Sequence, residues 1–546
     1  MKYILCSLSV FIVFQAFSQN RSFGTLPMVE NPNHNSNGSV RSKVDSSKYL
    51  KALKVYNNLV NARGDFRYPV PTFSMSSGDE WVAYMDYNKM EIAIENKALQ
   101  VCANFGAFEE PAIAFLLGHE LTHYYEKHKW KKGFGSEFSG LKIGLKIDSL
   151  YDDVSNETQA DYLGGFLAYS AGYGTFDKGS EIIKALYKAY KLPDILKKYP
   201  SLSDRQTLSV RTAEKLKQLI QVFDMANLLT AIGHYSEAYQ YYRYVLIEYQ
   251  SREIYNNLGV TALLDALQYF NSTELKFRYP IQLDLQSSAR DGSLSIQKRL
   301  ELLRQALLHF DAAISLDPNY PSPYLNKACA YALLGDLERA QFYGNVEARM
   351  ISMKMNDTIT LHNVDVLMGI LEATKGNKDE AKKFFQAASS AGSALAEINL
   401  KLLNNKDLGN EKLALSVKKE NIDNQNLKSI INDVEFKNTK SYGINEMIRF
   451  NFIESQNPFP NSFILQTDNS GASTQLYFQC TNPDYIGSTA RKIKLGSNLS
   501  EIVAAYGNPM TTIETTKGQI LVYKSQHLIF ILNNNKLEKW VLYDEG

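Results

Sequence analysis

The chain has 546 residues, which is too long for one domain and suggests about three or four. Hydrophobic residues make up 45% and charged residues 21%, values typical of a folded soluble protein. The formal net charge of +1 gives no reason to expect nucleic acid or an anionic membrane as the main partner.

The first residues predict a secretory signal. Lys2 precedes an apolar run over Tyr3–Phe17, and small residues near its end suit cleavage before Gln19. The run is short for a bilayer span, so a membrane anchor is the weaker interpretation. No later stretch approaches the roughly 18 continuous apolar residues of a membrane helix, and we expect an exported, soluble protein.

Three cysteines remain after the signal: Cys102, Cys329 and Cys480. They are odd in number and far apart, so no disulfide framework is expected. We interpret them as small buried hydrophobic residues.

A helix and a short hairpin are the first elements expected after a polar leader. Apolar positions at helical spacing predict a helix from Leu50 to Gly64. Alternating residues predict a strand over Met90–Ile94, and Ala98–Cys102 is expected to pair with it as a second strand.

The next helix carries the motif His119-Glu120-x-x-His123. Pro111, preceded by two glutamates, suits the helix start. A spacing of i, i+4 puts both imidazoles on one helical face, where they can share a zinc ion. Glu120 lies beside that position and can take a proton from the attacking water. The alternative is an amphipathic helix with two histidines on a half-buried face.

A second helix supplies a third ligand. The segment Asn156–Asp161 (NETQAD) opens this helix, with Ser155 or Asn156 as its cap. Glu157 lies 34 positions after the second motif histidine (157 − 123). Asp161 is one turn further along the same face, placed to accept the outer N–H of a metal-bound imidazole. The two motifs together predict one zinc ion per chain.

HELTH followed by ETQAD resembles the HExxH…ExxAD signature of the gluzincin peptidases that include HtpX, BepA and the CAAX-prenyl proteases. The resemblance implies a zincin-type domain that cleaves protein or peptide substrates. It makes His119, His123 and Glu157 the zinc ligands, Glu120 the general base and Asp161 the support of a ligand histidine. By similarity to BepA, it implies a periplasmic task in envelope protein quality control or processing, in solution or peripheral to an envelope membrane.

The resemblance covers roughly Tyr49 to Arg205 and departs from the family pattern at one position. Family members often carry His-Pro-x-x-x-x-Arg near the site. Here Pro200 and Arg205 match, but Tyr199 replaces the histidine, which gates or restrains the site in BepA-like members. Tyr199 is either a donor to the developing oxyanion or a packed surface residue.

From about Gln206 the chain reads as repeated helices. Small and aromatic residues recur at tetratricopeptide spacing over 226–242, most clearly over 306–340, and again over 369–384. A polar, strand-like segment over 270–297 interrupts them. The array either offers a concave surface to a protein partner or only stabilises the peptidase domain.

The C-terminal part reads as β-rich after a charged linker. Strands are expected over 447–452, 463–465, 476–480, 493–496, 521–523, 528–532 and 540–542, with a helix over 500–507. The last sixty or so residues look similar to the BamE/SmpA module of bacterial envelope proteins. This resemblance implies a further surface for protein partners.

The sequence therefore predicts a multidomain, mainly α protein with a zincin-type domain, an α-solenoid and a C-terminal α+β module. The expected parts are a signal peptide (1–18), a flexible leader (19–47), a zinc peptidase domain (48–210), tetratricopeptide-like repeats (211–403), a linker and β-rich region (404–485) and a BamE/SmpA-like module (486–546). The alternative to a metalloendopeptidase is an interaction scaffold or chaperone whose peptidase site is latent or rarely used.

Overall fold

The computed structural model of this chain describes residues 46–126, 153–174, 177–194, 201–271, 274–280, 292–405, 420, 427, 439–454, 462–471, 474–514 and 518–545. The expected signal peptide and nearly all of the leader lie outside these residues, as does Tyr199. Within the described residues, no helix combines the length and hydropathy that a bilayer span requires.

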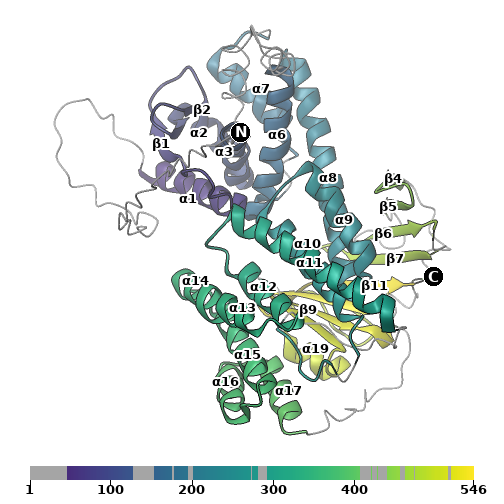
Figure 1. The fold of residues 1–546 in the computed structure, drawn as a ribbon. Helices are drawn as coiled ribbons and strands as arrows, with labels where there is room; N and C mark the ends of the chain where they lie inside the picture. Colours follow the sequence, from purple (N-terminus) through teal and green to yellow (C-terminus); the bar gives the residue numbers. More distant parts are fainter. Residues whose placement is uncertain are drawn as a thin grey trace, which may run out of the picture. The chain divides into compact units, whose positions relative to one another are not determined.

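The N-terminal region combines helices with a small sheet (Figure 1). Its elements are α1 (Ser46–Arg63), β1 (Thr72–Ser76), β2 (Ala83–Asp86), β3 (Glu91–Glu95), α2 (Asn96–Ala103), η1 (Gly106–Phe108), α3 (Glu109–Tyr125), α6 (Asp153–Ala168), η2 (Tyr169–Tyr173) and α7 (Gly179–Tyr190). The strand order is β1-β3-β2, with β1 parallel and β2 antiparallel to β3. The expected first helix and the strand near 90–94 are confirmed as α1 and β3.

Two local predictions in this region are wrong. The segment Ala98–Cys102 belongs to helix α2, not to a strand paired with β3. Ala98, Leu99, Val101 and Cys102 are buried, so helical rather than alternating burial decides the structure of this short apolar run. Helix α6 begins at Asp153, so Ser155 and Asn156 lie within it and do not cap it.

Helices alone make up the described part of residues 201–271 and 292–405. They are α8 (Leu202–Ile232), α9 (Tyr235–Glu248), α10 (Arg252–Leu267), α11 (Gly292–Leu316), α12 (Pro321–Leu333), α13 (Leu337–Gln341), η3 (Phe342–Ala348), α14 (Arg349–Met355), α15 (Thr358–Thr374), α16 (Lys378–Ser390) and α17 (Ala394–Leu403). Glycine lets paired helices approach: a Cβ atom on Gly369 would lie 2.6 Å from the Phe385 ring. Of the strand-like segment expected over 270–297, the described part contains no strand.

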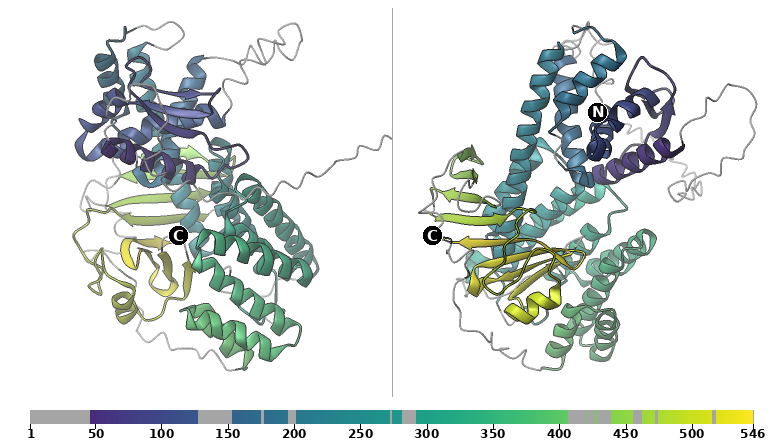
Figure 2. Two further views of the ribbon diagram at one scale, coloured as in Figure 1. Left: turned by 90° about the vertical axis from the view of Figure 1, so that its left-hand side faces the viewer. Right: turned by 180° about the vertical axis from the view of Figure 1, so that it is seen from behind.

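The C-terminal region is one eight-stranded antiparallel sheet (Figure 2). Its elements are β4 (Thr439–Gly443), β5 (Ile448–Glu454), β6 (Ser462–Asn469), β7 (Thr474–Thr481), α19 (Leu499–Tyr506), β8 (Thr511–Glu514), β9 (Gly518–Tyr523), η4 (Lys524–Gln526), β10 (Leu528–Asn533) and β11 (Lys536–Asp544). The order is β4-β5-β6-β7-β11-β10-β9-β8. Because β7 pairs with β11, the expected boundary between 485 and 486 falls inside this sheet.

Both faces of the sheet are covered. Helices α8 and α9 pack on one face, where Tyr241 contacts the Phe450 ring and donates a hydrogen bond to Thr467. Helix α19 lies on the other face, where Tyr506 packs against Phe530. The expected helix near 500–507 and six of the seven expected strands are therefore confirmed.

The strand expected over 493–496 is absent. Lys492 and Gly496 both adopt positive φ, which turns the backbone at each side of the segment. The Ile493 carbonyl accepts from the Thr489 N–H, so the segment is closed by a local turn.

Candidate metal centre

Helix α3 carries the first two candidate ligands, and α1 fixes its start. Lys51 lies 2.6 Å from the Glu109 carboxylate, and Lys54 lies 3.2 Å from that of Glu110. Both glutamates occupy the first turn, where negative charge favours the helix dipole. The helix then runs buried among the sheet, α1 and α6 towards the motif histidines.

Helix α6 approaches α3 at two glycines. A Cβ atom on Gly164 would lie 2.7 Å from the backbone of Gly118 and His119, so no larger residue fits there without movement. Likewise, a Cβ atom on Gly118 would lie 2.7 Å from the Gly164 carbonyl oxygen. This backbone contact brings Glu157, nearly two turns before Gly164, opposite the histidines of α3.

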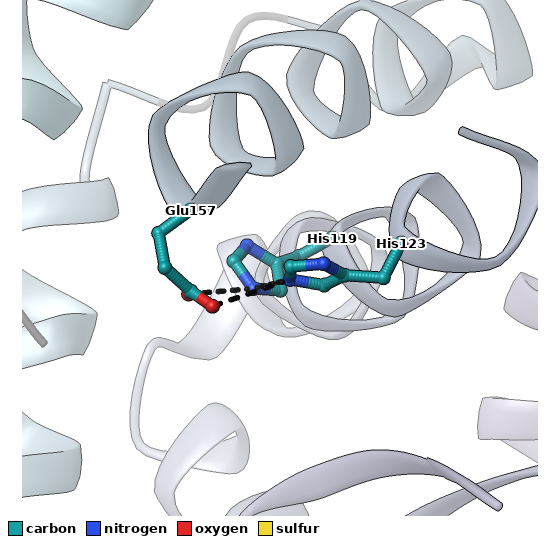
Figure 3. Close-up of side chains that lie close together, drawn as sticks. All are labelled: His119, His123 and Glu157. Carbon is teal, nitrogen blue, oxygen red and sulfur yellow. Dashed lines mark hydrogen bonds and ion pairs between the residues drawn. The ribbon is translucent and has the colours of Figure 1, made fainter. Parts of the chain in front are cut away.

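The predicted ligands His119, His123 and Glu157 lie together, and their side chains point towards one another (Figure 3). The two imidazole Nε2 atoms are 3.0 Å apart, and the Glu157 oxygens lie 3.3 Å from His119 and 3.5 Å from His123. Donors about 2.0–2.1 Å from a tetrahedral zinc ion are about 3.3 Å apart. The two nitrogens and the carboxylate therefore fit three corners of such a site.

Asp161 lies against the outer ring nitrogen of His119. Its Oδ1 lies 2.7 Å from His119 Nδ1, and the carboxylate is 5% exposed. When Nδ1–H donates to this carboxylate, the Nε2 lone pair faces the other two ligands.

The charges of these groups are strongly coupled. Burial alone would lower the pKa of His119, but its hydrogen bonds to Asp161 and Glu157 raise that pKa well above the ordinary value. Burial opposes the ionisation of Glu157, yet His119 and His123 hold its pKa at about 2. In the absence of a cation, the His119 imidazole therefore favours its protonated form beside the ionised carboxylate of Glu157.

Glu120 lies next to the ligand His119, and burial raises its pKa to about 7. The charge of Glu157 acts in the same direction, while His119 and Arg205 oppose it. A carboxylate with a pKa near 7 can accept and return a proton at neutral pH.

Two neighbours of the site were not assigned a role from the sequence. Tyr87 donates to the His123 carbonyl at 3.3 Å, and burial, with the charge of Glu120, raises its pKa to about 12. Arg205, near the start of α8, interacts electrostatically with Asp161 and Glu157. Its Nε is buried without a hydrogen-bond partner among the described residues. In the sequence, Arg205 is indicated by its match to the His-Pro-x-x-x-x-Arg pattern, whereas no pattern indicates Tyr87.

The three remaining cysteines are not part of this group of side chains, and they match their prediction. Cys102, Cys329 and Cys480 are free and buried, and burial raises the pKa of each thiol.

Comparison with known proteins identifies the repeat region. The tetratricopeptide repeat family model matches residues 309–342. Tetratricopeptide repeat protein 36 of Xenopus tropicalis is 31% identical over 131 residues, which is 24% of this chain and 61% of that protein. The chain thus spans about three fifths of the length of this curated relative.

A solved structure, a monomeric mutant of IFIT1 with Gppp-AAAA, covers 52% of this chain and 72% of its own. Its sequence identity of 13% and TM-score of 0.21 are too low to carry an argument about fold or site. The chain therefore contains a tetratricopeptide repeat within a mainly helical region, followed by an antiparallel β-sheet module.

Proposed function

We propose that the chain is a zinc-dependent endopeptidase whose repeats bind protein partners. One observation carries the enzymatic half: two imidazole nitrogens and a carboxylate lie within 4.8 Å of one another beside Glu120. The resemblance to HExxH…ExxAD peptidases supports the same assignment and extends it to a zincin-type domain.

The chain's own residues perform the proton transfers. A bound zinc ion would polarise the scissile carbonyl and make a water molecule more acidic. Glu120 accepts a proton from the attacking water and returns it to the leaving amine. Asp161 keeps His119 in the orientation that the ligand set requires.

Zinc content and proteolysis of the purified full-length protein test this proposal. We expect one zinc ion per chain in the wild type and in Glu120→Gln, and none in His123→Ala. Casein cleavage should fall by about 10²–10⁴-fold in Glu120→Gln, because the general base is lost. Asp379→Asn, in the first turn of the repeat helix α16, should cleave casein at the wild-type rate. A wild type that holds zinc and cleaves no protein or peptide would contradict the enzymatic half.

A second candidate, an interaction scaffold or chaperone with a latent site, is favoured by the tetratricopeptide match over 309–342. Suppression of the aggregation of an unfolded protein, equal in wild type and Glu120→Gln, would support it. The repeats and the sheet module would serve as partner surfaces in either case. Export to the periplasm remains part of the proposal, and fractionation of cells that express the full chain tests it.

A further inference from the structure

Trp81, in the loop between β1 and β2, is a large apolar residue that the fold leaves exposed. It is 67% exposed, although Val82, Ala83 and Met85, which follow it, all pack against the core of the N-terminal region. An exposed tryptophan keeps its large apolar surface in water and gains most when a partner covers it. Tryptophan is also enriched among the residues that dominate binding energies. Trp81 is therefore a candidate for a contact that forms on binding.

The backbone beside Trp81 is strained. Val82 has φ +63°, in the left-handed region that β-branched residues rarely adopt. Such conformations persist only where the surrounding contacts hold them, and they are concentrated at active sites and ligand clamps. The strain therefore calls for both a contact that maintains it and a use for the side chain that it displays.

Glu95, the last residue of β3, supplies that contact. It is 1% exposed, and its Oε1 accepts hydrogen bonds from the Glu80 and Trp81 N–H groups, each at 3.0 Å. Its own N–H donates to the Val82 carbonyl at 2.8 Å. A Cβ atom on Gly78 would lie 2.8 Å from Glu95 Oε1, so the loop wraps closely around this carboxylate. The backbone is held from the sheet side while the indole stays outside.

Strand β2, which begins two residues after Trp81, borders the candidate metal centre. It is the edge strand of the order β1-β3-β2, and α3 packs against it. Burial raises the pKa of Glu120 to about 7, and a hydrogen bond from the Met85 backbone N–H is among the contacts that oppose this rise. Just beyond β2, Tyr87 donates to the His123 carbonyl. The unpaired edge of β2 therefore faces Glu120, and Trp81 lies near the start of that edge.

A strand advances about 3.3 Å per residue, so Trp81 lies about four residues along the edge from Met85. We infer that Trp81 is a specificity-determining residue, which binds a large apolar side chain of the substrate about three to five residues from the scissile bond. The inference rests on the proposed peptidase activity and names its substrate class: polypeptides with a leucine, methionine or aromatic residue at that distance.

The pattern of cleavage sites tests the inference. Full-length wild type and Trp81→Ala, both loaded with zinc, are incubated with a peptide library, and mass spectrometry identifies the cut bonds. Wild-type sites should be enriched in large apolar residues at one fixed position about three to five residues from the cut. Trp81→Ala should lose this enrichment and Trp81→Phe should keep it, since an exposed side chain can be changed without opening a cavity. Identical patterns in wild type and Trp81→Ala would overturn the inference.

Steady-state kinetics on one cleaved library peptide separate binding from chemistry. Trp81→Ala should raise KM by about tenfold and leave kcat within about twofold, because Trp81 contacts the substrate away from the reacting atoms. Val82→Gly removes the strain that fixes the loop and should raise KM by about threefold. Ile486→Ala, at a residue that is 93% exposed, is the control and should leave both constants within about twofold. A fall in kcat without a rise in KM would contradict the assignment.

Photo-crosslinking provides a readout that needs no cleavage. Full-length Glu120→Gln protein carries p-benzoylphenylalanine in place of Trp81 and is illuminated with β-casein. The benzophenone carbonyl carbon then bonds to a carbon of the bound chain, whose hydrogen moves to the ketone oxygen. We expect a crosslinked product at position 81 and only background with the same group at position 486. No product at position 81 would refute the inference even if the wild type cleaves. A product there with a wild type that cleaves nothing would refute the peptidase activity and support Trp81 as a binding residue.

Discussion

Asp161 decides which nitrogen of His119 faces the other two ligands, because its carboxylate lies 2.7 Å from Nδ1. Asp161→Asn replaces a charged acceptor with a neutral amide that can present either N or O to the ring. We expect zinc affinity to fall by about 10–100-fold, the usual cost of losing such a support. Competition with a chromophoric chelator measures the change. Asp379→Asn, in the first turn of α16, is the matched control, and an unaltered affinity in Asp161→Asn would refute the orienting role.

Under the proposed zinc assignment, protons compete with zinc for His119. The pKa of His119 is raised, so below that pKa the metal-free imidazole is protonated, and zinc must displace the proton. Apparent zinc affinity should therefore rise with pH and level off above the raised pKa of His119. Glu157, with a pKa of about 2, stays ionised above that pH and adds no further dependence.

Calorimetry in two buffers of different ionisation enthalpy checks this prediction. Zinc binding near neutral pH should release about one proton, so the observed heat should change with the buffer. A heat that is the same in both buffers would contradict a protonated His119 in the metal-free site.

The clustering of His119, His123 and Glu157 could be predicted because helical spacing is rigid. The i, i+4 rule places His119 and His123 on one face, and the same rule relates Glu157 to Asp161. Tyr87 could not be predicted, because it reaches the His123 carbonyl only through the turn between β2 and β3, whose path is set by packing on α3.

At the scale of elements, the contact between α3 and α6 sets the distance between the candidate ligands on the two helices. Gly164→Ala would place a methyl carbon 2.7 Å from the backbone of Gly118 and His119, and backbone cannot rotate away. We expect α6 to be displaced together with Glu157, at a cost of about 1–3 kcal/mol in unfolding free energy. Thermal unfolding and zinc competition should both show the loss.

Gly165 provides a matched control on the same helix. A Cβ there meets only the end of the Leu216 side chain, at 3.3 Å, which can move by a few tenths of an ångström. Gly165→Ala should therefore bind zinc almost as the wild type does. Equal zinc affinity in Gly164→Ala and Gly165→Ala would show that the glycine contact does not position Glu157.

Apolar runs bounded by a turn signal were predictable, and short apolar runs without one were not. The continuous apolar run 528–532 is β10, and Asn534 and Asn535 after it adopt the left-handed conformation of a tight turn. In contrast, Ala98–Cys102 is too short for its pattern to separate helix from strand, and tertiary burial decides. The segment 493–496 is also too short for its pattern to decide. Lys492 and Gly496 adopt positive φ and turn the backbone, so the segment does not form the predicted strand.

At the scale of the whole molecule, the tetratricopeptide repeat was predictable because its period recurs along the sequence, and the family match over 309–342 bears it out. Pairing between distant strands leaves no such signal. β7 and β11 are joined in one sheet although some 55 residues separate them, since Cys480 pairs with Val541. A boundary drawn from composition at 485 therefore divides strands that share one core.

Arg63 joins the end of α1 to the repeat helices. Its guanidinium donates to the Gln250 carbonyl and to Glu126, each at 3.3 Å, and lies 5.7 Å from the Tyr249 ring centre. Arg63→Met keeps an apolar stem of similar length but removes the donors and the charge. Because the side chain is buried, we expect a loss of about 1–3 kcal/mol in unfolding free energy.

The calorimetric unfolding profile should then change in form as well as in midpoint. Without Arg63, fewer contacts hold the N-terminal region to the repeats, and the remaining ones include the Phe66 N–H with the Leu316 carbonyl and the Phe166 ring with the Tyr249 ring. We expect the transition to broaden or split, with the region that carries the candidate metal centre melting first and shifting upward when zinc is added. Arg339→Met, at a residue with a 62% exposed side chain, should leave the profile unchanged. If Arg63→Met and Arg339→Met unfold alike, the two regions are coupled through other contacts, and Arg63 is not the residue that joins them.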